Sequence, residues 1–252
     1  FLFFPIKMQS VNKPKVVGPF GKVDGNHLIS NYENFTNHVE ESNGMYTSNL
    51  KKNTYSFKTD LRTPKLGIML VGLGGNNGTT FTAGLLANKH NICWESKQGS
   101  HKPNYLGSIT QCSGTKIGIN KSKEVYIPLN QILPVVNPNE VVVGGWDISD
   151  MNLKDAMRRA QVLEYDLQSK VGPYMKDIVP LPAVYYQDFI ADNQKERATN
   201  VIAGDNKKEH LDTVRAQIKK FKEDNNCDKV VVMWSANTER YCKVTAGVHD
   251  TA

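Results

Sequence analysis

The chain has 252 residues, of which 39% are hydrophobic and 22% charged, a composition typical of globular proteins with one or two domains. Its net charge of +6 comes from 31 Lys and Arg against 25 Asp and Glu, and this excess is spread along the chain. Nucleic-acid binding is therefore not expected, because it requires a concentrated basic face. A small anionic substrate fits this charge pattern at least as well.

The cysteines and the apolar runs point to a reducing, cytoplasmic environment. Cys93, Cys112, Cys227 and Cys242 are far apart, with no C-x-x-C pair and no histidine at zinc spacing, so we expect neither a metal site nor a disulfide framework. No apolar run approaches the roughly 20 residues that span a bilayer. The opening segment 1–6 is too short for a signal peptide, and Met8 is a candidate natural start.

Residues 1–60 are interpreted as an N-terminal extension. They are rich in Asn, Ser, Lys and Gly and show little periodicity. Residues 53–60 alone alternate Tyr55 and Phe57 with polar neighbours, which predicts a half-exposed strand. Packing of the extension on another domain and free disorder both remain open.

The segment 66–86, LGIMLVGLGGNNGTTFTAGLL, predicts a buried strand, a glycine turn and a helix. Glycines allow a backbone to approach a diphosphate, whose charge is stabilised by the helix N-terminus. The spacing is Gly72-x-Gly74-x-x-x-Gly78, and by spacing alone the acidic residue for a ribose would be Glu95. A tight turn that binds nothing is the alternative.

Further along the chain, Val141–Val143 predicts a second apolar strand that stops at Gly-Gly-Trp-Asp. Asp147 therefore falls at the carboxyl end of a strand, where open α/β sheets bind ligands. Leu153 to Leu167 predicts one amphipathic helix, capped by Asp150 or Asn152, with Arg158 and Arg159 facing outward.

The last third of the chain repeats this alternation. Gly172-Pro173 is interpreted as a break, residues 208–224 predict an amphipathic helix, and residues 229–234 predict a third buried strand. A short strand is also predicted at 125–127, and residues 179–182 are interpreted as a second break, ahead of residues 183–186. Buried strands that alternate with helices predict an α/β fold, a Rossmann-like parallel sheet with flanking helices.

Five motifs in the same order closely resemble those of the eukaryotic myo-inositol-1-phosphate synthase family: GLGGNNGTT, NYLGSITQ, GGWDISDMNLKDAMRRAQVL, DFIADNQKERATN and MWSANTERYC. The resemblance runs from about Asn53 to the end. It implies an isomerase that uses tightly held NAD to convert glucose 6-phosphate into inositol phosphate without net redox change. It also implies a cytoplasmic homotetramer in inositol and phospholipid biosynthesis.

The resemblance further implies which residues bind NAD: Gly72, Gly74, Gly75, Asn76, Asn77, Asp147, Gln194, Arg197, Ser235, Ala236, Asn237 and Thr238. On this assignment Asp147, not Glu95, holds the adenosine ribose. Two positions depart from the family pattern, since Ser235 replaces a usual Thr and His249 replaces an Asn.

The family's chains are about twice as long, so residues 61–252 are expected to form a partial NAD-binding domain. The resemblance places the catalytic and tetramerisation domain beyond residue 252, and no catalytic residue is assigned here. A non-catalytic Rossmann module that senses nucleotide is the alternative function. An ordinary NAD dehydrogenase or a nucleoside-cofactor methyltransferase would rest on the glycine loop alone.

Overall fold

The computed structural model describes residues 16, 18, 21–187, 191–236 and 246–247. The chain divides into two compact units, one with residues 1–63 and 105–135 and the other with residues 64–104 and 136–252. The division expected from the sequence, an extension 1–60 and a domain 61–252, stays a prediction.

The second unit is built on a four-stranded parallel sheet in the order β10-β9-β4-β11. The central strand β4 (Leu66–Val71) pairs with β9 (Val142–Asp147) and β11 (Lys229–Trp234), and β10 (Leu181–Pro182) pairs with β9. Numbered along the chain, this order is 3-2-1-4, that of a dinucleotide-binding half-sheet. The predicted Rossmann-like α/β fold is confirmed.

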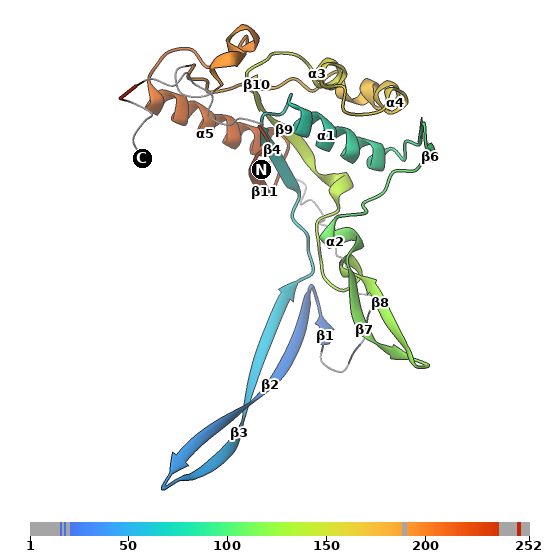
Figure 1. Cartoon of the computed structure of the whole chain (residues 1–252), viewed down its shortest axis with the longest axis vertical. Helices are drawn as coiled ribbons and strands as arrows, with labels where there is room; N and C mark the ends of the chain where they lie inside the picture. Colours follow the sequence, from blue (N-terminus) through green and yellow to red (C-terminus); the bar gives the residue numbers. More distant parts are fainter. Residues whose placement is uncertain (1–15, 17, 19–20, 188–190, 237–245, 248–252) are drawn as a thin grey trace, which may run out of the picture. The chain divides into compact units, whose positions relative to one another are not determined.

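Helices cover both faces of this sheet (Figure 1). Helices α1 (Asn76–Lys89), α3 (Leu153–Ala160) and α4 (Tyr165–Met175) pack against the face that includes Ile68 and Leu70. Helix α5 (Lys207–Asp224) packs against the face that includes Met69 and Val71. Strand β4 is therefore buried by helices on both sides, as its uniformly apolar sequence predicts.

Two glycines on neighbouring strands let α5 approach the sheet closely. A Cβ atom on Gly67 would lie 2.7 Å from Cε1 of Phe221, and one on Gly144 would lie 2.6 Å from its Cε2. The ring of Phe221 therefore occupies the space that side chains at these two positions would fill. This contact fixes the distance between α5 and the centre of the sheet.

The prediction of one helix from Leu153 to Leu167 is wrong. Helix α3 ends at Ala160 because Gln161 adopts the left-handed conformation with φ 51°, and α4 starts at Tyr165. Asn152 is the cap, since its side chain accepts from the N–H of Asp155. The break predicted at Gly172-Pro173 is also wrong, because both residues lie within α4, which continues to Met175.

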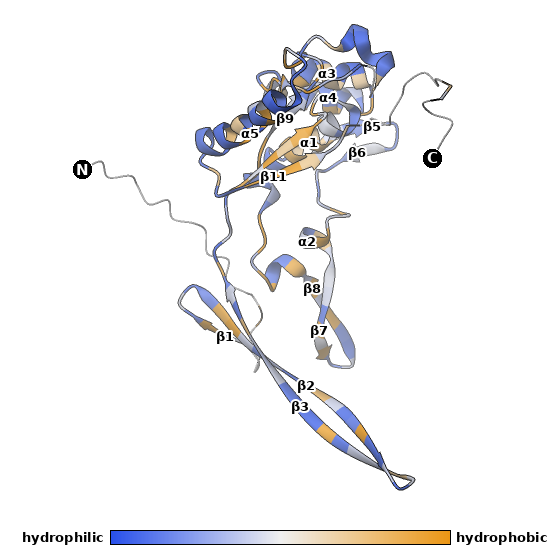
Figure 2. Ribbon diagram, turned by 90° about the vertical axis from the view of Figure 1, so that its left-hand side faces the viewer, coloured by the Kyte–Doolittle hydropathy of each residue, from blue (hydrophilic) through white to orange (hydrophobic). Residues whose placement is uncertain are grey.

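Residues 229–234 form the predicted strand, β11, but the prediction that this strand is buried is wrong. Val231, Val232, Met233 and Trp234 are 40–62% exposed. Strand β11 is an edge strand that pairs only with β4 among the described strands, and its Val230 packs against the buried cluster that includes Met69. Figure 2 shows the hydrophobic character of this strand.

The first unit contains a long antiparallel hairpin, of which only residues 53–60 are predicted as strand. Strands β2 (His27–Ser42) and β3 (Met45–Asp60) pair along their whole length, with β1 (Gly21–Asp24) beside β2. Asn43 and Gly44 form the turn with φ of 52° and 75°, as a two-residue hairpin loop requires. Exposed apolar side chains lie on both faces of this ribbon, so no simple alternation marks it in the sequence.

Shorter elements complete the two units. The strand predicted at 125–127 is confirmed within β8, whereas the two-residue strand β10 lies in a segment that the sequence predicts as a break. The first unit also holds α2 (Ile109–Cys112), β7 (Gly114–Asn120), β8 (Lys123–Pro128) and η1 (Leu129–Gln131), and the second holds β5 (Trp94–Ser96), β6 (Gly99–His101), η2 (Pro138–Glu140) and η3 (Asp192–Arg197). Over the described ranges, no helix has both the length and the hydropathy required to cross a membrane.

We predict that Phe221→Ala lowers the free energy of unfolding by about 2 kcal/mol, because it empties the space above Gly67 and Gly144. Urea denaturation followed by circular dichroism measures this change. Leu211→Ala is the matched control, since Leu211 lies on the same helix and is 49% exposed. Equal losses for the two variants would contradict the role given to Phe221.

Candidate functional site

The glycine loop follows β4 at the carboxyl edge of the sheet. The N–H groups of Gly72 and Leu73 donate to the carbonyl of Trp146 at 2.8 and 2.9 Å, which ties the loop to the end of β9. Gly72 has φ +89°, and a Cβ atom there would lie 2.7 Å from Cα of Ala236. Both the backbone angle and the space require glycine at this position.

The loop leads into a helix N-terminus whose first backbone donors have no hydrogen-bond partner among the described residues. Helix α1 has Gly75 as its N-cap, with no side-chain cap and no acidic residue in its first turn. The first cap bond runs from the N–H of Thr79 to the carbonyl of Gly75. The N–H groups of Asn76, Asn77 and Gly78 therefore lack an intrahelical acceptor, and the helix dipole makes this end attractive to an anion.

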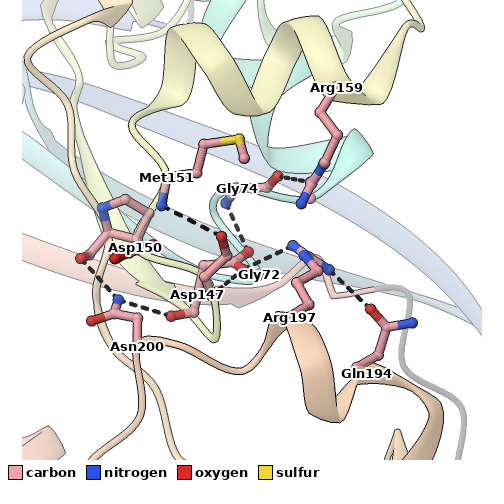
Figure 3. A network of polar contacts seen from close by, with 12 residues as sticks. Gly72, Gly74, Asp147, Asp150, Met151, Arg159, Gln194, Arg197 and Asn200 are labelled. Carbon is pink, nitrogen blue, oxygen red and sulfur yellow. Dashed lines mark hydrogen bonds and ion pairs between the residues drawn. The ribbon is translucent and has the colours of Figure 1, made fainter.

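Asp147 joins the end of β9 to the glycine loop (Figure 3). Its side chain is 4% exposed. One carboxylate oxygen, Oδ2, accepts from the N–H of Gly74 at 2.9 Å, and the other, Oδ1, accepts from the N–H of Ser149 at 3.1 Å. The carboxylate is thus fixed directly beside the loop, in the position of the acidic residue of a dinucleotide-binding sheet.

Arg197 completes the charge pair at this point. Its Nη2 donates to Oδ1 of Asp147 at 2.9 Å, and its Nη1 donates to Oε1 of Gln194 at 3.4 Å. Both residues lie on η3, so the segment 192–197 lies beside the carboxyl edge of β9. The Nε atom of Arg197 is buried and has no hydrogen-bond partner among the described residues.

Two residues that sequence reasoning did not assign hold this arrangement. Nδ2 of Asn200 donates to the carbonyl oxygens of Asp147 and Pro180 at 3.0 and 3.2 Å, which secures the end of β9. Arg159, predicted on the outward face of its helix, reaches the loop, where its Nη2 donates to the carbonyl of Gly74 at 2.8 Å. Burial, followed by repulsion from Arg197, lowers the pKa of Arg159.

The end of β11 reaches the glycine loop from the other side. The backbone N–H and the hydroxyl of Ser235 both donate to the carbonyl of Val71 at 3.0 Å. The side-chain amide of Asn77 donates to the carbonyl of Ser235 at 3.3 Å. Ser235 and Ala236 therefore lie at the loop, whereas Asn237, Thr238 and His249 lie outside the described residues.

Glu95 does not take part in this network in the described part of the chain. It lies in β5, and its N–H donates to the carboxylate of Asp166 at 2.8 Å. Spacing from the loop therefore points to the wrong strand, since the second strand of the sheet is β9.

The residues at the loop fit NAD in their chemistry. The unpaired N–H groups of α1 suit a diphosphate, the carboxylate of Asp147 suits ribose hydroxyls, and the orphaned Nε of Arg197 is a donor that calls for an acceptor. The assignment of the individual NAD contacts stays a prediction.

A family model described as myo-inositol-1-phosphate synthase, covering an NAD-binding domain, matches residues 66–252. Inositol-3-phosphate synthase isozyme 1 of Arabidopsis thaliana is 52% identical over 242 residues, which are 94% of this chain and 47% of that protein. The inositol-3-phosphate synthase of Dictyostelium discoideum is 48% identical over 238 residues, 94% of this chain and 46% of that protein.

A solved structure agrees with these relatives. The crystal structure of inositol-3-phosphate synthase from Caenorhabditis elegans matches with a TM-score of 0.80 and 45% identity, over 92% of this chain and 46% of that chain. The chain thus spans about half the length of the relatives it matches. It belongs to the myo-inositol-1-phosphate synthase family, and the part that the family model matches is an NAD-binding domain, with NAD as its cofactor.

Proposed function

We propose that the complete protein is an inositol-3-phosphate synthase, an isomerase that converts D-glucose 6-phosphate into 1D-myo-inositol 3-phosphate. This chain provides the NAD site of that enzyme. The family match supports the proposal, and the observation that carries the site is the hydrogen bond from Gly74 to the buried carboxylate of Asp147.

The proposed NAD contacts divide among four segments, whose described residues meet at the carboxyl edge of the sheet. The glycine loop and the start of α1 hold the diphosphate, Asp147 accepts from the ribose hydroxyls, and Gln194 and Arg197 flank it. Ser235 and Ala236 contribute contacts from the end of β11, and Asn237 and Thr238, which lie outside the described residues, are assigned by the resemblance alone. These residues are Gly72, Gly74, Gly75, Asn76, Asn77, Asp147, Gln194, Arg197, Ser235, Ala236, Asn237 and Thr238.

The reaction explains why the cofactor must be held rigidly. Bound NAD would supply reversible hydride transfer at C5 of the sugar, oxidising it before ring closure and reducing it afterwards. The C5 ketone makes the C6 proton acidic, and the resulting carbanion equivalent attacks the C1 aldehyde in an intramolecular aldol step. Lysines that stabilise the oxyanions are expected in the part of the protein beyond this chain. The residues described here bind and orient the cofactor.

The setting of the complete protein follows from the resemblance to the family. We propose a cytoplasmic homotetramer that serves inositol and phospholipid biosynthesis and binds neither nucleic acid nor membrane. The dispersed net charge of +6 supports the part of this proposal that concerns nucleic acid.

We predict that Asp147→Asn in the complete protein weakens NAD binding by about 1–3 kcal/mol, as expected when a charged acceptor loses its charge. Isothermal titration calorimetry measures the dissociation constant. Asp155→Asn is the control, because this substitution removes the same charge from α3. There the carboxylate of Asp155 accepts a hydrogen bond from the side chain of Asn152. An unchanged dissociation constant for Asp147→Asn would count against the ribose assignment.

We also predict that the complete protein makes inositol phosphate from glucose 6-phosphate with no net formation of NADH, and that residues 1–252 alone make none. Phosphorus NMR follows the product, and absorbance follows NADH. Binding of NAD without any product would favour the non-catalytic Rossmann module. Accumulation of NADH would instead indicate an ordinary dehydrogenase. Product formation by residues 1–252 alone would contradict the proposal that catalysis requires the rest of the protein.

A further inference from the structure

Arg159 lies beside the glycine loop with most of its hydrogen-bonding capacity unused (Figure 3). It stands in the last turn of α3, and its Nη2 donates to the carbonyl of Gly74 at 2.8 Å. A guanidinium carries five N–H donors. The bond to Gly74 is the one hydrogen bond that Arg159 makes with the described residues, and the residue is exposed, so a ligand can reach its other donors from solvent.

The charges around Arg159 leave one positive charge uncompensated. Asp147 is the carboxylate at this point, and it already pairs with Arg197 at 2.9 Å. Arg159 makes no ion pair within the described ranges. Its guanidinium also bonds to the residue directly before the N-cap Gly75, so it adds to the positive end of α1. Two independent sources of positive potential therefore meet at one place.

An orphaned donor on the neighbouring guanidinium supports the same conclusion. Nε of Arg197 is buried without a partner among the described residues. Buried donors without an acceptor are rare in proteins, and they indicate that an acceptor belongs nearby. Arg159 and Arg197 thus both lie near Asp147 with donors to spare (Figure 3).

We propose that Arg159 is a further NAD-binding residue that holds the phosphate attached to the adenosine ribose; this inference rests on the proposed function. A ribose held by Asp147 directs its 5′-phosphate toward the start of α1. Gly74 lies between Asp147 and this helix end, because its N–H donates to Asp147 and it directly precedes the N-cap Gly75. The planar fork of a guanidinium suits two oxygens of one phosphate. The phosphate of glucose 6-phosphate has the same chemistry, but the contact with Gly74 beside Asp147 favours the nucleotide.

The test compares Arg159→Gln with Arg158→Gln in the complete protein. The two variants lose the same charge from the same helical turn, but Arg158 lines a separate surface pocket with Gln161, Tyr165 and Gln168. Dissociation constants are measured for NAD, ADP, adenosine and glucose 6-phosphate. We expect Arg159→Gln to weaken NAD and ADP about tenfold, as for one lost charge-assisted hydrogen bond. Adenosine and glucose 6-phosphate should change less than about twofold, and Arg158→Gln should change none of the four.

Each other outcome is decisive. Equal weakening of ADP and adenosine would show that Arg159 only supports the loop, and selective weakening of glucose 6-phosphate would assign it to the substrate; both overturn the inference. Unchanged affinities for Arg159→Gln also overturn it, whereas a wild-type protein that binds no NAD overturns the proposed function itself. If Arg159→Gln does not fold, Arg159→Lys decides: a selective, smaller loss for ADP supports the inference, and no loss contradicts it.

Discussion

The hydrogen bond between the N–H of Gly74 and the carboxylate of Asp147 organises this site. It joins the loop that follows the central strand to the end of the neighbouring strand, two points that lie 73 residues apart in the chain. The parallel pairing of β4 with β9 brings both carboxyl ends to one edge, and Gly72 and Leu73 bond to the carbonyl just before Asp147. The position of the acidic group and the shape of the loop are therefore fixed together.

Burial of Asp147 requires the rest of the network. A carboxylate that is 4% exposed loses most of its hydration, and this loss is costly unless donors replace the water. Backbone N–H groups from Gly74 and Ser149 and the guanidinium of Arg197 supply those donors. Asn200 then secures the backbone of Asp147 from the segment that also carries Arg197. The segment 194–200 is thus part of the site because it compensates a buried charge.

The sequence predicted those parts of the structure that depend on local patterns. The strand, glycine loop and helix at 66–89, the helix at 207–224 and the position of Asp147 at a strand end follow from periodicity and turn residues. The contact of Arg159 with Gly74 could not be predicted in this way. Helical periodicity gives the face of the helix on which a residue lies, but it does not show which group the end of a long side chain contacts. The break of the helix at Gln161 depends on one left-handed residue that has no glycine to mark it.

Two other features depend on tertiary context. An apolar run such as 229–234 predicts burial on both faces, yet the described strands leave β11 at an edge. The hairpin of β2 and β3 places Tyr32 and Tyr55 on one face and Phe35 on the other, so outside residues 53–60 the sequence shows no sustained alternation of apolar and polar residues. Pairing across the Asn43-Gly44 turn, and not burial, determines this structure.

A crystal structure of the protein with ADP-ribose tests the central claim most directly. The account predicts diphosphate oxygens within hydrogen-bond distance of the backbone N–H groups at the start of α1, and ribose hydroxyls on the carboxylate of Asp147. A ligand whose diphosphate lies away from this loop, with Asp147 still bonded only to protein, would contradict it.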